Sequence, residues 1–212
     1  MAAPWNVRFT VKHPGLGGRE GTVEIAVDPS LAPIGAQRFA DLVDDGYFTE
    51  CRFHRSVPGF IIQWGIPADP KAYAKWGDNK IKDDPVKVTN SKATLSFATS
   101  GPHARGSQIF VNLGDNEGLD DQGCAARELV RHDARHRAGG EYVSRTLLTA
   151  ARSVVRSFSP FAQVTKGMEE FGAISDMGEP AQKPDQQAAK EQGNAYLGQF
   201  TKLSYIVSAT RI

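Results

Sequence analysis

The chain has 212 residues, of which 40% are hydrophobic and 23% charged, and these values predict one globular domain with a core of moderate size. Lysine and arginine number 25 against 24 acidic residues, so the overall charge argues against a binder of nucleic acid or acidic membranes. Two cysteines, Cys51 and Cys124, are too few for a disulfide framework, no apolar run reaches the ~18 residues of a membrane span, and the N-terminus lacks the apolar core of a signal peptide. We therefore expect a monomer of the cytoplasm, with the nucleus as the alternative, and no membrane partner.

Turn signals and apolar periodicity divide the chain into short elements. Alternation over residues 5–12 and 21–28, on either side of a Pro-Gly-Leu-Gly-Gly turn, predicts a β-hairpin. Residues 33–46 carry apolar side chains at helical spacing between an initial proline and a final glycine, which predicts an amphipathic helix. Further strands are predicted at residues 51–57, 60–64, 94–98, 108–113, 161–165 and 203–209, and further helices at residues 168–174 and 195–200.

This succession of many short strands with few helices predicts a mainly β fold, either a sandwich or a barrel. The stretch at residues 67–92 is polar and irregular, and its length predicts a functional loop. We find no internal repeat, so residues 1–212 are interpreted as a single domain.

Two stretches contain the residue types of a ligand pocket. Residues 53–63 read Phe-His-Arg-Ser-Val-Pro-Gly-Phe-Ile-Ile-Gln, and residues 106–111 read Gly-Ser-Gln-Ile-Phe-Val. An arginine such as Arg55 in largely apolar sequence is costly unless it is paired or faces a groove. Apolar walls with a few directed donors are typical of ligand sites, which favours a pocket. The alternatives are a structural ion pair for Arg55 and an ordinary core role for the phenylalanines.

These stretches resemble the two signature blocks of the cyclophilin family of peptidyl-prolyl cis–trans isomerases. The resemblance covers nearly the whole chain outside residues 124–157, including residues 33–39 and 161–168. It implies an eight-stranded antiparallel closed barrel capped by two α-helices. It also implies an enzyme without cofactor or metal that isomerises X–Pro bonds of peptides and unfolded proteins and so assists folding.

The chemistry of the X–Pro bond explains these residue types. Its rotation barrier of roughly 18–20 kcal/mol comes from the double-bond character of the C–N bond, and the nitrogen regains its lone pair in the twisted transition state. A fixed guanidinium then stabilises the transition state more than the ground state. The resemblance implies that Arg55 is this catalytic donor and that Gln63 holds the peptide and supports Arg55. The residues that the resemblance places beside the substrate are His54, Phe60, Ile61, Gln63, Ala98, Thr99, Gln108, Phe110, Leu119 and Phe158.

Two of these residues have a plain structural alternative. A histidine in the position of His54 is more often a satisfied buried side chain than an acid or base, so we assign it no proton transfer. Gln108 either contacts the peptide or only holds a loop.

Three positions depart from the common family pattern. Gly118 stands where many cyclophilins carry a tryptophan that is associated with cyclosporin binding, so we expect weak affinity for cyclosporin. Phe158 stands where many carry a histidine, and it can still close an apolar pocket. Trp64 replaces a more usual glycine, and its bulk is expected to narrow the choice of substrate.

Residues 124–157 differ in composition from the rest of the chain. These 34 residues contain seven arginines, no lysine and three acidic residues, which gives a net charge of +4. Joining Gly123 directly to Phe158 restores uninterrupted family-like sequence, so the segment is interpreted as an insertion into the single domain. It is either a surface insertion that caps the groove or docks a partner, a loop without function, or a retained intron. We expect neither a zinc site at His132 and His136 nor RNA binding by its arginines.

Two functions from different classes therefore compete. The first is a cofactor-free peptidyl-prolyl isomerase with Arg55 as its catalytic residue. The second is a catalytically weak module that binds proline-containing peptides, its groove modified by residues 124–157.

Overall fold

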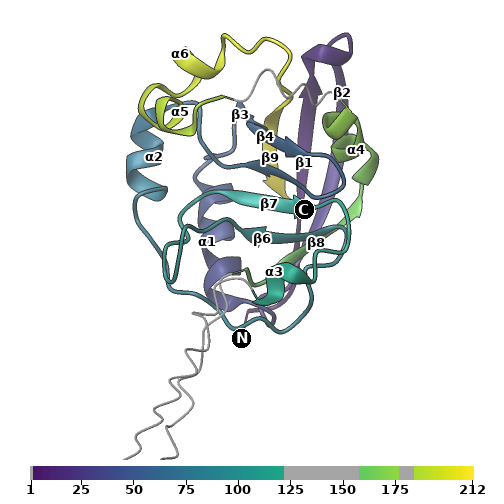
Figure 1. Ribbon diagram of the computed structural model, residues 1–212, viewed down its shortest axis with the longest axis vertical. Coiled ribbons are helices and arrows are strands. Elements are labelled where there is room, and N and C mark those ends of the chain that lie inside the picture. The colour runs from purple at the N-terminus through teal and green to yellow at the C-terminus, as the bar shows by residue number, and fades with distance from the viewer. Residues whose placement is uncertain (1, 122–157, 177–183) are drawn as a thin grey trace, which may run out of the picture.

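The computed structural model describes residues 2–121, 158–176 and 184–212 (Figure 1). The arginine-rich segment at 124–157, which begins with Cys124, lies outside the described residues. The predictions made for this segment therefore stay predictions. The elements are β1 Trp5–His13, the 3₁₀ helix Pro14–Leu16, β2 Arg19–Val27, α1 Pro33–Asp44, β3 Cys51–Arg52, β4 Arg55–Val57, β5 Ile61–Trp64, α2 Pro70–Trp76, β6 Thr94–Phe97, β7 Ile109–Asn112, α3 Gly118–Asp121, β8 Ala162–Lys166, α4 Met168–Asp176, α5 Gln186–Gln192, α6 Asn194–Leu197 and β9 Tyr205–Arg211.

The strands form one antiparallel sheet in the order β3-β9-β1-β2-β8-β6-β7-β5-β4. The mainly β prediction is confirmed, but the described residues contain nine strands rather than eight. The difference arises because residues 51–57, which were predicted as one strand, form the two strands β3 and β4. The chain changes strand partners at residues 53–54. Arg52 pairs with Tyr205 of β9, whereas Arg55 pairs with Gln63 of β5. The two ends of the sheet are thus joined by the chain itself, and the sheet curls into a barrel-like shape.

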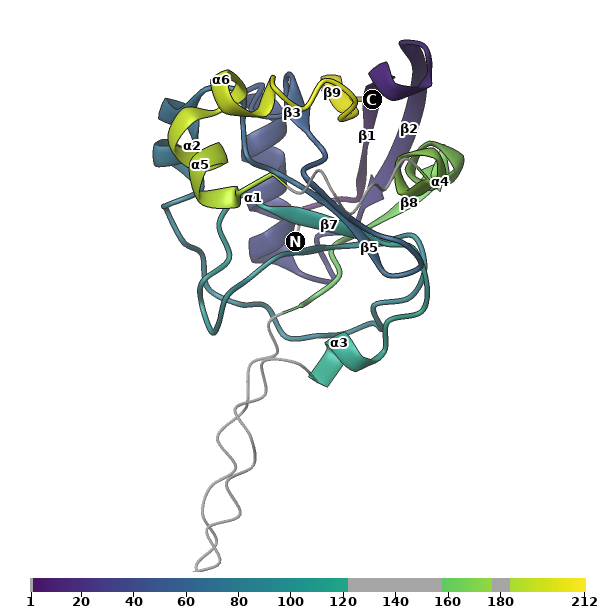
Figure 2. The same ribbon diagram turned by 45° about the horizontal axis from the view of Figure 1, so that its top comes forward.

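Two helices cover the ends of the curled sheet, as the resemblance implied. Phe39 of α1 lies 5.1 Å from the ring of Phe161, and Phe171 of α4 stacks on Trp64 at 5.8 Å. Each aromatic side chain buries a large apolar area, so these pairs anchor both helices to the core. The chain adds α2, α5 and α6, which gather on one side of the molecule (Figures 1 and 2). Helix α2 lies within the stretch at 67–92 that was predicted as a loop.

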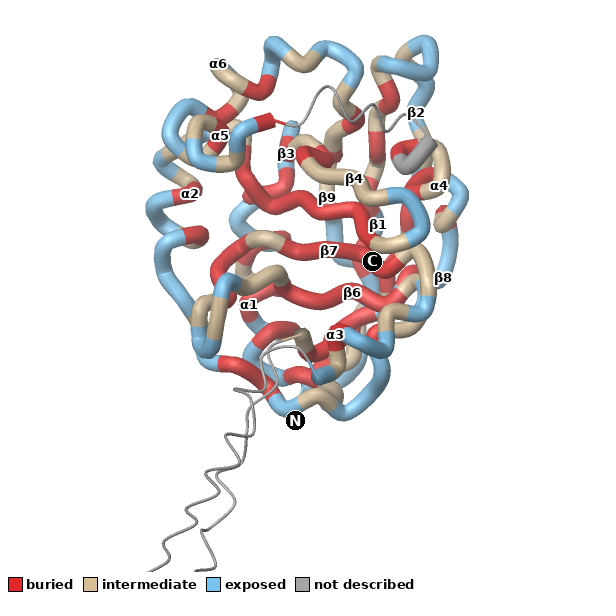
Figure 3. Tube along the Cα trace, viewed as in Figure 1, coloured by how far each residue is buried: buried red, intermediate tan, exposed pale blue. Residues whose placement is uncertain are grey.

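The burial pattern separates outer from central strands. Strands β1 and β2 alternate between buried and accessible residues, whereas every residue of β5, β6 and β7 is buried (Figure 3). One face of the central strands belongs to the main core. The other face carries a separate apolar cluster that includes Ile61, Phe110 and Leu119. The sheet therefore has a second apolar surface outside the core, and the candidate site lies there. Within the described ranges, no helix combines the length and apolar character needed to cross a membrane.

A buried ion-pair cluster ties the loop before β6 to helix α1 and to the loop before β7. The guanidinium of Arg105, which is 0% exposed, lies 3.2 Å from Asp83 and 3.0 Å from Asp84. The Asp84 carboxylate also accepts hydrogen bonds from the amides of Ile34 and Gly35. These amides belong to the first turn of α1, whose N-cap residue has no side-chain hydrogen bond of its own. Asp84 thus supplies a cap from a distant loop and places negative charge at the positive end of the helix.

Removal of the Arg105 guanidinium should destabilise the fold strongly. Arg105→Leu would leave Asp83 and Asp84 buried without their cation, and such a loss costs about 3–5 kcal/mol. We expect the free energy of unfolding in urea to fall by that amount. Arg8→Leu is the matched control, because it removes the Arg8–Glu24 ion pair at the surface and should cost less than about 1 kcal/mol. Equal losses for both variants would contradict a special role for the buried cluster.

Candidate active site

The site is built on two neighbouring strands that bring a cation and an amide together. Arg55 of β4 lies opposite Gln63 of β5 in the antiparallel ladder. Opposite residues on one face of such a ladder lie within side-chain reach. The Arg55 Nη1 donates to Gln63 Oε1 at 3.0 Å, and Gln63 Nε2 donates to Gln108 Oε1 at 2.7 Å. This chain of donors and acceptors fixes the guanidinium at one place on the outer face of the sheet.

A hollow of about 240 Å³ opens beside this guanidinium, and we call it the Arg55 hollow. Its floor is the apolar cluster of Ile61, Phe110 and Leu119, with the ring of Phe158 5.7 Å from that of Phe110. Its lining consists of Arg55, Phe60, Ile61, Gln63, Ala98, Thr99, Phe110, Leu119, Phe158 and Gln186. An apolar hollow with one cation and two side-chain amides suits a small apolar group attached to a polar backbone.

Buried polar contacts hold the walls of the hollow in place. Asn90, which is buried, donates to the Asp120 carboxylate at 2.7 Å and to the carbonyl of Phe158 at 2.9 Å. Asn116 donates to the carbonyl of Phe60 at 2.9 Å. Asn90 also accepts a hydrogen bond from the Ser96 hydroxyl of β6 at 2.8 Å, so short helix α3 and Phe158 are tied to the sheet through Asn90. Because buried amides must be paired, these contacts also specify a single arrangement of the walls.

The structure brings together most of the residues predicted for the site. Nine of the eleven line the Arg55 hollow, and Gln108 contacts Gln63 from an adjoining hollow described below. His54 is 3% exposed and lies outside both linings. The roles of these residues stay predictions, since placement alone does not test them.

One lining residue, Gln186, was missed because helix α5 was not predicted. A signal for this helix exists in the sequence. Asp185 accepts a hydrogen bond from the amide of Ala188, and Gly193 follows the last turn. Aspartate before a helix and glycine after it are common end signals. What the sequence does not contain is the position of α5 against the sheet.

Trp64 does not narrow the hollow, contrary to the expectation from sequence. Its indole is 0% exposed, stacks on Phe171 and contacts the rings of Phe9 and Phe53 edge-on. Side chains alternate between the two faces of a strand, so Gln63 and Trp64 must point to opposite faces. Because Gln63 faces the hollow, Trp64 faces the core.

The electrostatics of the hollow leave the guanidinium available. Arg55 forms no ion pair with any described residue, which disfavours the structural ion pair considered as its alternative. None of the lining residues is acidic. Burial lowers the pKa of the nearby His54 to about 4, so its ring is neutral at pH 7. Arg55 is thus the one formal charge among the lining residues.

Comparison with known proteins gives the class of the molecule. The family described as "Cyclophilin type peptidyl-prolyl cis-trans isomerase/CLD" matches residues 9–191. The chain therefore belongs to the cyclophilin-type peptidyl-prolyl cis–trans isomerase family.

Individual relatives agree with this assignment. The chain is 34% identical over 119 residues to peptidyl-prolyl cis-trans isomerase A of Dickeya dadantii, covering 52% of this chain and 59% of that protein. It is also 34% identical over 109 residues to peptidyl-prolyl cis-trans isomerase-like 3 of Rhizopus delemar, covering 47% of this chain and 64% of that protein. The chain thus matches less than two thirds of the length of these relatives.

Solved structures share the fold. A cyclophilin type peptidyl-prolyl cis-trans isomerase of Cryptosporidium parvum aligns with a TM-score of 0.61 over 99% of this chain and 98% of its own, at 17% identity. The same Cryptosporidium protein crystallised in the presence of the dipeptide Ala-Pro aligns at 0.60 over 97% of both chains, also at 17% identity. At this identity the likeness establishes the fold.

The buried ring of His54 should make stability depend on pH. Its pKa is about 4 in the folded chain, against an ordinary value of 6.5, so folding favours the neutral ring. The contribution is fully present above pH 6.5 and is lost as the pH falls from 6.5 towards 4. We expect the unfolding free energy to fall less steeply over this range in His54→Gln than in the wild type. An NMR titration midpoint of the His54 ring above pH 6 would contradict the account.

Proposed function

We propose that this chain is a peptidyl-prolyl cis–trans isomerase acting on X–Pro bonds of peptides and unfolded proteins. The observation that carries the proposal is the Arg55 guanidinium, held by Gln63 at the edge of an apolar hollow. Family membership supports it, and so do the relatives named peptidyl-prolyl cis–trans isomerases.

The geometry suggests how the barrier is lowered. The proline ring enters the apolar floor formed by Ile61, Phe110 and Leu119, which leaves its amide nitrogen near the guanidinium. The bond to Gln63 uses one of several guanidinium N–H donors, so another can reach that nitrogen. As the bond twists, the nitrogen regains its lone pair and becomes a better acceptor. Arg55 then binds the transition state more strongly than either planar isomer, and no covalent step is needed.

The scarcity of other charges in the Arg55 hollow strengthens the hydrogen bond between Arg55 and the proline nitrogen. The hollow is lined by apolar and amide groups, with no carboxylate to neutralise Arg55. A charge-assisted hydrogen bond is worth more in such surroundings than in water. Gln63, Gln186 and Thr99 offer polar atoms for the peptide backbone.

Loss of the guanidinium should separate catalysis from binding. We expect Arg55→Ala to lower kcat/KM for an X–Pro peptide by about 10²–10³-fold, the usual cost of removing one donor to a transition state. The affinity for the peptide should fall far less, because the apolar floor is intact. Exchange spectroscopy by NMR measures the isomerisation rate, and a peptide titration measures the affinity.

Arg52→Ala is the matched control, since Arg52 lies three positions earlier and stacks on Tyr205 at 5.2 Å, outside the hollow. It should retain the wild-type rate. If the wild-type chain binds the peptide without accelerating its cis–trans exchange, the isomerase proposal is wrong. The peptide-binding module is then the function that remains.

A further inference from the structure

A second hollow adjoins the Arg55 hollow on the side of helix α5. It has a volume of about 200 Å³ and shares Gln63, Ala98, Thr99 and Gln186 with its neighbour. Its remaining lining includes Tyr73, Gly77, Lys80, Gln108 and Lys190. An extended peptide advances about 3.3 Å per residue. Because the two hollows share four lining residues, and three residues of extended peptide span about 10 Å, we take three residues on either side of the proline as the reach between them.

The charged residues of this lining are Lys80 and Lys190, and the lining contains no carboxylate, so we call it the Lys80–Lys190 hollow. The Lys190 ammonium lies 5.7 Å from the centre of the Tyr73 ring, and the Lys80 ammonium donates to the carbonyl of Gly77. Both ammonium groups thus have a contact beside the hollow, with Lys80 exposed and Lys190 half-buried.

These two lysines differ from three other lysines that are paired with carboxylates. Lys12, Lys75 and Lys166 each form an ion pair with a nearby carboxylate. Among the described residues, neither Lys80 nor Lys190 forms one. The lining of the second hollow thus contains two cations and no carboxylate, while Asp78 and Glu191 line a further hollow that the same two lysines border.

The pKa of Lys80 is lowered, chiefly by burial. Burial lowers it first, Asp78 raises it, and the charges of Lys190 and Arg38 lower it further. Lys190 and Arg38 thus repel Lys80, and Asp78 acts against this repulsion. An incoming carboxylate would relieve this repulsion and form charge-assisted hydrogen bonds with both ammonium groups.

We propose that the Lys80–Lys190 hollow selects peptides with an aspartate or glutamate within about three residues of the isomerised proline. The inference rests on the proposed function and adds to it the class of substrate. The Arg55 hollow recognises the proline, and the lysines recognise the acidic side chain.

The test compares two series of short peptides that each contain one X–Pro bond. One series carries a single glutamate at each of the three positions before or after proline, and the other carries glutamine there. We expect the full chain to prefer glutamate by about threefold to tenfold in kcat/KM at one or two of these positions at low salt. The preference should shrink in ~1 M salt, because salt screens such charges.

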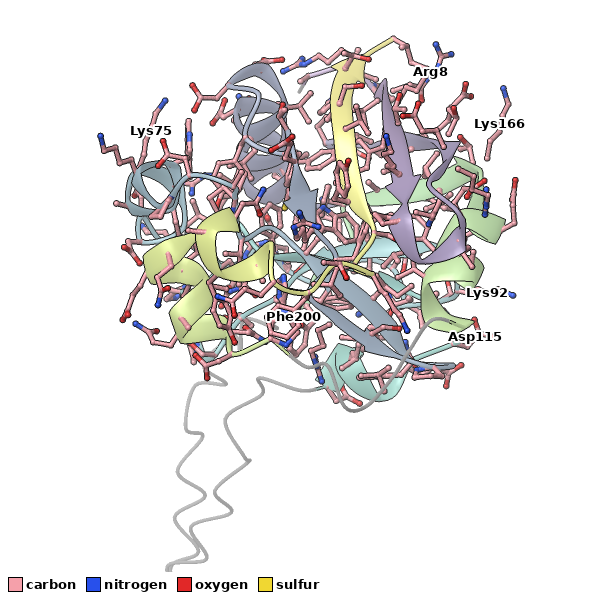
Figure 4. All side chains as sticks on the ribbon, turned by 90° about the horizontal axis from the view of Figure 1, so that it is seen from above. Arg8, Lys75, Lys92, Asp115, Lys166 and Phe200 are labelled. Carbon is pink, nitrogen blue, oxygen red and sulfur yellow. The ribbon has the colours of Figure 1, made fainter. Side chains whose placement is uncertain are left out.

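Variants decide whether the lysines cause this preference. In Lys190→Gln and in Lys80→Gln the ratio of glutamate to glutamine peptides should fall towards one, and Lys190→Glu should reverse it. Lys92→Gln is the matched control, because Lys92 is exposed and lies on the opposite side of the molecule from α2 and α5 (Figure 4). Its ratio should equal that of the wild type.

The outcomes separate the two proposals. If glutamine and glutamate peptides are isomerised equally well at every position, the acidic-substrate inference is wrong and the isomerase stands. If neither series is isomerised, the proposed function itself fails. A glutamate preference that persists in both lysine variants would place the recognition elsewhere and overturn the inference.

Discussion

The hydrogen bond between Arg55 and Gln63 is the interaction on which the site depends. A free arginine side chain samples many rotamers, and a donor must be fixed before the reaction to lower a barrier. Gln63 fixes the guanidinium at 3.0 Å, and Gln108 in turn holds Gln63 at 2.7 Å. The backbone also contributes, because the ladder places Arg55 opposite Gln63. In the proposed function, catalysis follows from this preorganised charge.

The break at residues 53–54 makes this arrangement available. It lets one stretch of chain pair first with β9 and then with β5, so that the sheet curls and its outer face carries an apolar hollow. The same break leaves His54 buried and, through desolvation, neutral at pH 7. The main core and the hollow therefore lie on opposite faces of the same central strands. Within β5, Trp64 packs in the main core and Gln63 lines the hollow that we propose as the active site.

The elements that depend on interactions between residues close in sequence were predicted from the sequence. The hairpin and α1 follow from alternation, helical spacing and end signals, whereas nine of the ten residues that line the Arg55 hollow were predicted through the family resemblance. The two-residue period of a strand would also have placed Trp64 in the core, had it been applied to β5. The contribution of Gln186, and the cap that Asp84 gives to α1, depend on contacts between distant segments. Such contacts leave no pattern in the neighbouring sequence.

The most direct measurement of the central claim is a double-mutant cycle between Arg55 and Gln63, read as kcat/KM for an X–Pro peptide. If Gln63 acts by holding the guanidinium, Gln63→Leu should lower the rate about tenfold in the wild type and less than about twofold in the Arg55→Ala background. Leucine keeps much of the volume, so packing is largely retained. Equal losses in both backgrounds would mean that Gln63 acts independently of Arg55, and would contradict the account.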